Sequence, residues 1–103
     1  MKLERLTEIL LELRAASKQL KLDYSEDKGK ALMLKYNMIF FDKNMNEINS
    51  RELRDTLDAY FHETITNDEL NELIPIACKA LKMQYAPSVD VNSVIDCYDI
   101  ILW

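Results

Sequence analysis

Apolar side chains recur at alternating spacings of three and four along the first 21 residues. Ser17 takes one position of this stripe, and leucines take the others: Leu3, Leu6, Leu10, Leu13 and Leu20. Such a period places the apolar side chains on one face of a helix. The sequence therefore predicts an amphipathic helix over residues 2–21.

A second helix is predicted over residues 26–41. Ser25 stands where an N-cap hydroxyl is expected, and the two acidic residues that follow it suit the first turn of a helix. In the second half of this segment only Lys35 and Asn37 are polar, so the helix is apolar nearly all round. We expect it to lie centrally, in contact with several neighbours. A buried strand is the alternative for the same segment.

Two capping boxes predict a third and a fourth helix. Asn49 and Glu52 have the spacing in which each side chain can bond the backbone N–H of the other residue, and Thr66 and Glu69 repeat it. Apolar residues follow each box at helical spacing: Leu53, Leu57, Tyr60 and Phe61 in the third helix, and Leu70, Leu73, Ile74, Ala77 and Leu81 in the fourth. Pro75 lies inside the fourth helix, where we expect a kink or a short break.

The C-terminal segment also shows a helical period. Its apolar positions are Val91, Val94, Ile95, Tyr98, Ile101 and Leu102. Their β-branched content would also suit a strand, but the period favours a fifth helix after a connector at residues 84–89. The predicted fold class is all-α: a single compact domain over residues 1–103, with about five short helices in an orthogonal or bundle-like arrangement.

Charge and the lengths of the apolar runs indicate where the protein is located and which classes of partner it favours. Eighteen acidic and thirteen basic side chains give a net charge of −5, which favours basic partners and disfavours nucleic acid. The longest apolar run is far shorter than the roughly 20 residues that cross a bilayer. Charged residues also interrupt the N-terminal leucines, where an export signal needs an unbroken apolar segment. We therefore expect a cytoplasmic protein with no membrane partner, in which Cys78 and Cys97 are buried free thiols.

Residues 42–52 resemble an EF-hand calcium loop. Asp42, Asn44 and Asn46 match its first three side-chain ligands, and Glu52 matches its closing carboxylate. The segment is one residue short, however, and has a glutamate where the sharp turn of such a loop needs glycine. We therefore predict no metal site, keep these four residues as a weak candidate loop, and prefer the interpretation that the segment is a turn ending in a helix cap.

Catalytic constellations are not recognisable. The single histidine, His62, has no cysteine or serine that the sequence can place beside it, and no Glu-x-x-His pair is present. Carboxylate pairs such as Asp96 and Asp99 fit solvated helix faces better than acid and base catalysis. We therefore expect neither an enzyme nor a cofactor.

The leading functional hypothesis is a small, acidic, non-enzymatic protein–protein interaction module. It would be an adaptor or inhibitor of the kind found among phage and mobile-element proteins. On a C-terminal helix, Asp90, Asp96 and Asp99 would form a contact patch with Tyr98 and Trp103 for a partner protein with a basic surface. Apolar residues in excess of what the core needs also point to a homo-oligomer.

Two alternatives stay open. Residues 65–95, a capped helix followed by a Pro-Ser connector and a further short helix, are similar to phage helicase-loader domains. That resemblance implies a nucleic-acid-associated regulator or replication accessory domain, for which Arg14, Lys18 and Lys21 form a basic stripe on the first helix. The other alternative is a degenerate EF-hand-like calcium-binding module.

Overall fold

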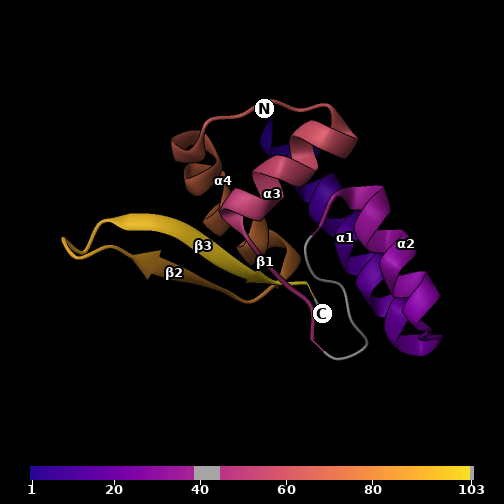
Figure 1. Ribbon diagram of the computed structural model, residues 1–103. Coiled ribbons are helices and arrows are strands. Elements are labelled where there is room, and N and C mark those ends of the chain that lie inside the picture. Colours follow the sequence, from indigo (N-terminus) through magenta and orange to yellow (C-terminus); the bar gives the residue numbers. More distant parts are fainter. Residues whose placement is uncertain (39–44, 103) are drawn as a thin grey trace.

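The computed structural model describes residues 1–38 and 45–102. Within these ranges the helical elements are α1 (Leu3–Leu22), α2 (Glu26–Tyr36), α3 (Ser50–Thr56), the π-helical turn η1 (Leu57–Phe61) and α4 (Asn67–Leu81). The strands are β1 (Glu47–Asn49), β2 (Tyr85–Val89) and β3 (Ile95–Ile101). They form an antiparallel sheet in the order β1-β3-β2 (Figure 1). The fold is therefore a mixture of helices and a small sheet, and the all-α prediction of about five helices is wrong.

The error lies in residues 84–102, where a connector and a fifth helix were predicted. These residues form the β2–β3 hairpin instead. Val94, Tyr98 and Leu102 are four residues apart, a spacing close to one helical turn and equal to two strand repeats. Positions with this spacing share a face in a helix and also in an uninterrupted strand, so the apolar period alone does not distinguish the two. The β-branched residues around a short polar turn are the signal that favoured strands.

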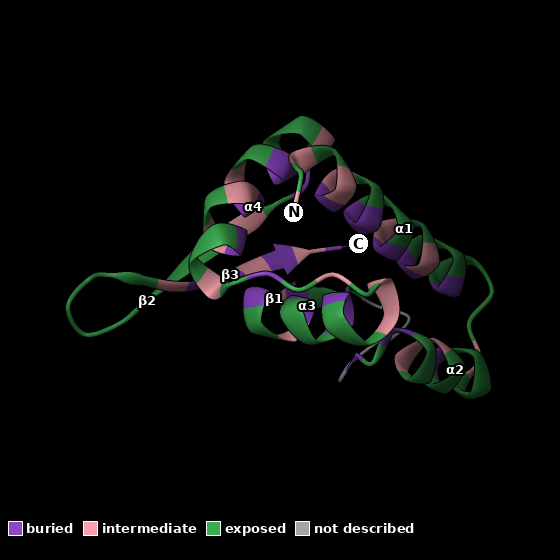
Figure 2. Ribbon diagram, turned by 90° about the horizontal axis from the view of Figure 1, so that it is seen from above, coloured by how far each residue is buried: buried purple, intermediate pink, exposed green. Residues whose placement is uncertain are grey.

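The core lies between one side of the sheet and the helices α1, α3 and α4. In Figure 2 the buried segments of α1 and α4 face β3. The fully buried side chains of this core include Leu6, Leu10 and Leu13 of α1, Leu53 of α3, Leu57 of η1, Leu70 and Ile74 of α4, and Ile48 and Ile100 of the sheet. The prediction of an amphipathic first helix is confirmed, because its leucine stripe supplies one wall of this core.

A buried polar pair joins α1 to the sheet. The Asn46 side-chain amide donates a hydrogen bond to Ser17 Oγ at 2.7 Å, and neither side chain is exposed to solvent. The Asn46 carbonyl accepts a further bond, 2.7 Å long, from the Leu102 N–H. The serine that interrupts the leucine stripe of α1 is thus the partner of a residue from outside the helix.

The predicted helix starts are confirmed. Ser25 Oγ accepts the Lys28 N–H at 3.1 Å, and Thr66 Oγ1 accepts the Glu69 N–H at 3.2 Å. At Asn49 the first bond of the capping box forms, from the Glu52 N–H to Asn49 Oδ1, whereas the Glu52 carboxylate accepts from the Asn49 side-chain amide. The α4 helix continues through Pro75, so no break occurs there.

The α2 helix is shorter and more peripheral than predicted. It ends at Tyr36, because Asn37 adopts a left-handed backbone, and residues 39–41 of the prediction lie outside the described residues. Its buried residues are Gly29 and Tyr36, whereas Leu34 is 85% exposed. The expectation of a central helix with several neighbours is therefore wrong. The apolar content of α2 is spread around its circumference, so one side contacts the molecule and the rest faces solvent.

Both cysteines are buried free thiols, as predicted. Burial raises the pKa of Cys78 to about 11, which keeps this thiol protonated and unreactive. Across the described ranges, no helix has both the length and the apolar character needed to cross a membrane.

Candidate interaction surface

The β2–β3 hairpin extends away from the helices at one end of the molecule (Figure 1). Its turn is built around Asp90, whose Oδ1 accepts the backbone N–H groups of Asn92 and Val94 at 2.8 and 3.1 Å. The Asp90 N–H donates to the Val94 carbonyl at 2.9 Å, and the Ser93 N–H donates to the Asp90 carbonyl at 3.1 Å. An aspartate that bonds the backbone two residues ahead fixes a turn locally. The turn is therefore organised by its own side chain.

Large apolar side chains at the end of this hairpin face solvent. Val91 is fully exposed, and Val89, Val94 and Ile95 are between 43% and 59% exposed. We call these four residues the apolar tip. Single exposed apolar residues are common on proteins, but a cluster on a projecting element is typical of an interaction site.

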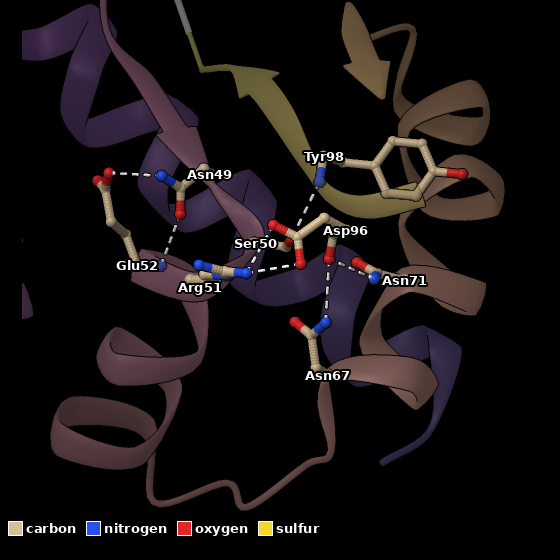
Figure 3. Close-up of polar contacts among 8 residues, drawn as sticks. All are labelled: Asn49, Ser50, Arg51, Glu52, Asn67, Asn71, Asp96 and Tyr98. Atoms are coloured by element: carbon tan, nitrogen blue, oxygen red, sulfur yellow. Dashed lines mark hydrogen bonds and ion pairs between the residues drawn. The ribbon is translucent and has the colours of Figure 1, made fainter. Parts of the chain in front are cut away.

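The base of the hairpin is held by Asp96 (Figure 3). Both carboxylate oxygens of Asp96 accept from Arg51 Nη2 of α3 at 2.5 Å. Its carbonyl accepts from the side-chain amides of Asn67 and Asn71 of α4 at 3.0 and 3.1 Å. One strand residue is thus tied to two helices, and we call these four residues the hairpin clamp.

Side chains also bind backbone groups of β3 beyond the end of the shorter strand β1. Strand β1 pairs with β3 only at residues 99–101. Beyond that point the Tyr98 N–H donates to Ser50 Oγ at 3.0 Å (Figure 3), and the next outward carbonyl is the one that the two α4 asparagines bind. Unpaired strand groups need such partners when they lie against the body of a protein. The helices therefore complete the edge of β3 where the hairpin leaves the body.

A β-bulge lies at the same place. Ser88 is opposite Cys97, while Val89 is opposite Ile95, so Asp96 is the extra residue on β3. A bulge bends its strand and increases the local twist. The clamp therefore holds the residue at which the direction of the hairpin changes.

Acidic side chains occupy the face of the sheet opposite the core. Asp99 pairs with Asn49 across the strands, and Glu47 lies on the same face. Burial and the neighbouring carboxylates of Asp99, Glu47 and Asp55 raise the pKa of Glu52. A cationic group here would relieve this repulsion, so the surface favours basic side chains over phosphate.

The structure does not bring the predicted patch residues onto one surface. Asp90 is in the turn, Asp96 is in the clamp, and Tyr98 is buried with its ring 5.8 Å from that of Tyr85. Asp99 lies on the opposite face from Tyr98, because neighbouring residues of a strand alternate. Trp103 lies outside the described residues.

In the described part of the candidate calcium loop, residues 45–52, the candidate ligands pack in the core or cap a helix. Asp42 and Asn44 lie outside the described residues, and Asn46 is buried against Ser17. The Glu52 N–H donates to Asn49 Oδ1, and the Asn49 side-chain amide donates to Glu52 Oε1, both at 2.9 Å (Figure 3). The described residues contain no group of three or more His, Cys, Asp or Glu side chains that could hold a metal ion.

A polar hollow of about 610 Å³ lies between α3 and the loop before α4. Two arginines and three carboxylates line it together. Arg54 Nε donates to the Ile65 carbonyl at 3.0 Å, and Arg51 holds Asp96. These arginines therefore serve the framework of the fold.

The sequence did not point to the residues that this structure exposes most. Val91 and Val94 were predicted to lie on the apolar face of a helix, although they flank an Asn-Ser pair that is typical of turns. Read as two short β-branched runs around a polar turn, residues 85–101 would have predicted a hairpin. The exposure of its end could not have been predicted, because it depends on where the helices stop covering the sheet.

No family model matches the chain, and searches of curated proteins and of solved structures return no match. The surface of the hairpin and the residues that orient it are therefore the observations on which a function can be based.

Proposed function

We propose that this protein is a non-enzymatic protein-binding module, an adaptor or inhibitor, that contacts its partner with the β2–β3 hairpin. The observation that carries the proposal is the apolar tip, whose four β-branched side chains face solvent on an element that projects from the body. Burying them against a partner would be favourable, at about 1.5 kcal/mol for each large side chain. A projecting apolar tip without a partner would instead be an aggregation hazard.

The chemistry of the partner surface follows from the charges around the tip. Asp90 is the only charged residue in the segment 83–95. The sheet face that carries Glu47 and Asp99 is acidic, as is the chain as a whole. We therefore expect the partner to be a protein that offers an apolar depression with basic side chains at its rim.

The hairpin clamp supports this role. An element that is already ordered loses less conformational entropy on binding. Arg51, Asn67 and Asn71 hold the bulged residue of β3, so the tip is presented from a fixed base. Its location in the cytoplasm is part of the proposal, which the two buried free thiols support.

The nucleic-acid alternative has weaker support. It depended on the basic stripe of α1, but Arg14 Nη1 of that stripe donates to the Leu81 carbonyl at 2.8 Å, at the C-terminal end of α4. This guanidinium helps to join two helices. Protein binding through the hairpin is therefore the favoured function.

The test compares wild type with Val91→Ser/Val94→Ser. Both immobilised proteins are exposed to extract of the source cell, retained proteins are quantified by mass spectrometry, and the main candidate is purified for calorimetry. Loss of two valines that the partner would bury should weaken its binding by roughly 100-fold, since burial of each contributes about 1.5 kcal/mol.

The matched control is Ile76→Ser on α4, which removes an apolar side chain of similar exposure away from the hairpin. This variant should bind as wild type does. Equal affinities for wild type and for the double tip variant would overturn the proposal.

A further inference from the structure

A groove of about 650 Å³ lies between α1 and α2. Its apolar walls come from Ala15, Ala16 and Leu20 of α1 and from Ala31 and Leu32 of α2. Pockets that take small groups or peptide side chains have volumes of about 300–1,000 Å³ and mostly apolar walls. The groove is therefore large enough to receive a few apolar side chains.

Two lysines and two carboxylates lie on the rim of the groove. Lys28 at one end pairs with Asp23, and Glu12 at the other forms a hydrogen bond with Tyr36. Lys35 Nζ lies 5.0 Å from the centre of the Tyr36 ring and forms no ion pair within the described residues. The groove thus presents apolar walls with an available ammonium group beside them.

The apolar tip has the complementary chemistry. It consists of four β-branched side chains around Asp90, and the turn uses only Oδ1 of that carboxylate. Oδ2 remains for a cationic partner. The proposed function predicts an apolar depression on the partner, and the groove of this chain offers one, with the Lys35 ammonium group beside it.

The two features lie at opposite ends of the molecule. The hairpin projects at one end, and α1 and α2 form the other (Figures 1 and 2). A molecule therefore cannot fill its own groove with its own tip. The tip of a second copy can reach it, and repetition of such a contact makes an open head-to-tail chain.

We propose that the apolar tip of one copy inserts into the α1–α2 groove of another, with Asp90 directed to Lys35. This inference rests on the proposed function, because it names a second copy of the chain as a partner of the hairpin. The contact is small, below the about 1,200 Å² of stable complexes. The association is therefore weak, and an external partner with a better groove would compete with it.

Sedimentation velocity and light scattering on the full chain test the proposal. The mean mass of wild type should rise with concentration beyond that of a dimer, with half-association at roughly 100 μM to 1 mM, the range of weak contacts. Val91→Ser/Val94→Ser should remain a monomer. Ala31→Glu should also remain a monomer, because it fills the groove at an exposed helix position and repels Asp90. Lys35→Glu should weaken association at least five-fold.

Mixing the two monomeric variants gives the decisive result. The double tip variant keeps its groove and Ala31→Glu keeps its tip, so an equimolar mixture should form a dimer and nothing larger. Ala80→Glu, at an exposed alanine of α4, is the control and should associate as wild type does.

Two results would overturn the inference. One is a wild type that stays monomeric at about 1 mM, the upper end of the expected range. The other is association that persists in Ala31→Glu. Neither result affects the proposed function, which fails separately if the double tip variant binds the captured partner as wild type does.

Discussion

At the scale of single residues, the buried pair of Ser17 and Asn46 shows how a polar interruption can be part of a core. The hydroxyl lies in a leucine stripe, and it accepts the Asn46 amide 29 positions later in the chain. Buried polar groups need partners, since leaving one unpaired costs about 1–3 kcal/mol. The pair therefore helps to fix the position of the sheet against α1.

Ser17→Ala should lower the free energy of unfolding by about 1–3 kcal/mol, because it removes a partner from the buried Asn46 amide. Urea unfolding followed by circular dichroism measures the change. Ser88→Ala is the control at an exposed position and should stay within about 0.5 kcal/mol of wild type. Equal stability of Ser17→Ala and wild type would mean that the buried bond contributes nothing.

At the scale of elements, the hairpin shows where the period of the sequence was ambiguous. Residues four apart share a face in a helix and in a strand. The strand is favoured because its residues pair with residues 47–49 and 85–89 and because the hairpin clamp binds it to α3 and α4. All these partners lie outside residues 91–102, and those at 47–49 and on the helices are distant in sequence, so the choice is not encoded in residues 91–102 alone.

The clamp predicts non-additive effects of its asparagines. Asn67 and Asn71 donate to the same Asp96 carbonyl, and the side-chain oxygen of each is buried without a partner in the described structure. Asn67→Leu and Asn71→Leu should each change the free energy of unfolding by less than about 1 kcal/mol, because one donor remains. The double variant should lose about 2 kcal/mol more than the sum of the single changes, since it leaves the carbonyl unpaired.

A double-mutant cycle by urea unfolding tests this prediction. Additive losses would show that the two amides act independently. The same variants report on the hairpin through backbone relaxation by NMR, in which only the double variant should loosen residues 89–95.

At the scale of the whole molecule, α2 is the least integrated helix. It is attached through Tyr36, whose ring lies 4.8 Å from that of Tyr60 and 6.1 Å from that of Phe61. Burial and the hydrogen bond with Glu12 raise the pKa of Tyr36. Tyr36 is therefore the one large buried side chain of the helix that forms the outer wall of the groove, and Leu32 and Met33 add partly buried contacts.

Tyr36→Ala should release α2 while the core stays folded. Hydrogen exchange measured by NMR should show loss of protection in α2, with protection kept in α1 and α4, because local units can open below the global unfolding transition. Tyr36→Phe should keep α2 in place, since it keeps the ring and loses only one bond of about 1 kcal/mol. Parallel loss of protection in α2 and α4 would contradict this prediction.

The sequence by itself determined the features that depend on near neighbours. The period of α1, the serine, asparagine and threonine caps and the burial of the cysteines follow from side chains within a few residues of each other, or from their apolar character. It also led to the prediction of a contact patch in the C-terminal segment, on residues that the structure separates.

Only the tertiary structure decided the rest. The peripheral place of α2, the burial of Asn46 and the strand form of residues 95–101 depend on contacts between segments far apart in the chain. The exposure of the apolar tip has the same origin. A period shows which side chains share a face, but the packing of the other elements decides whether that face is covered.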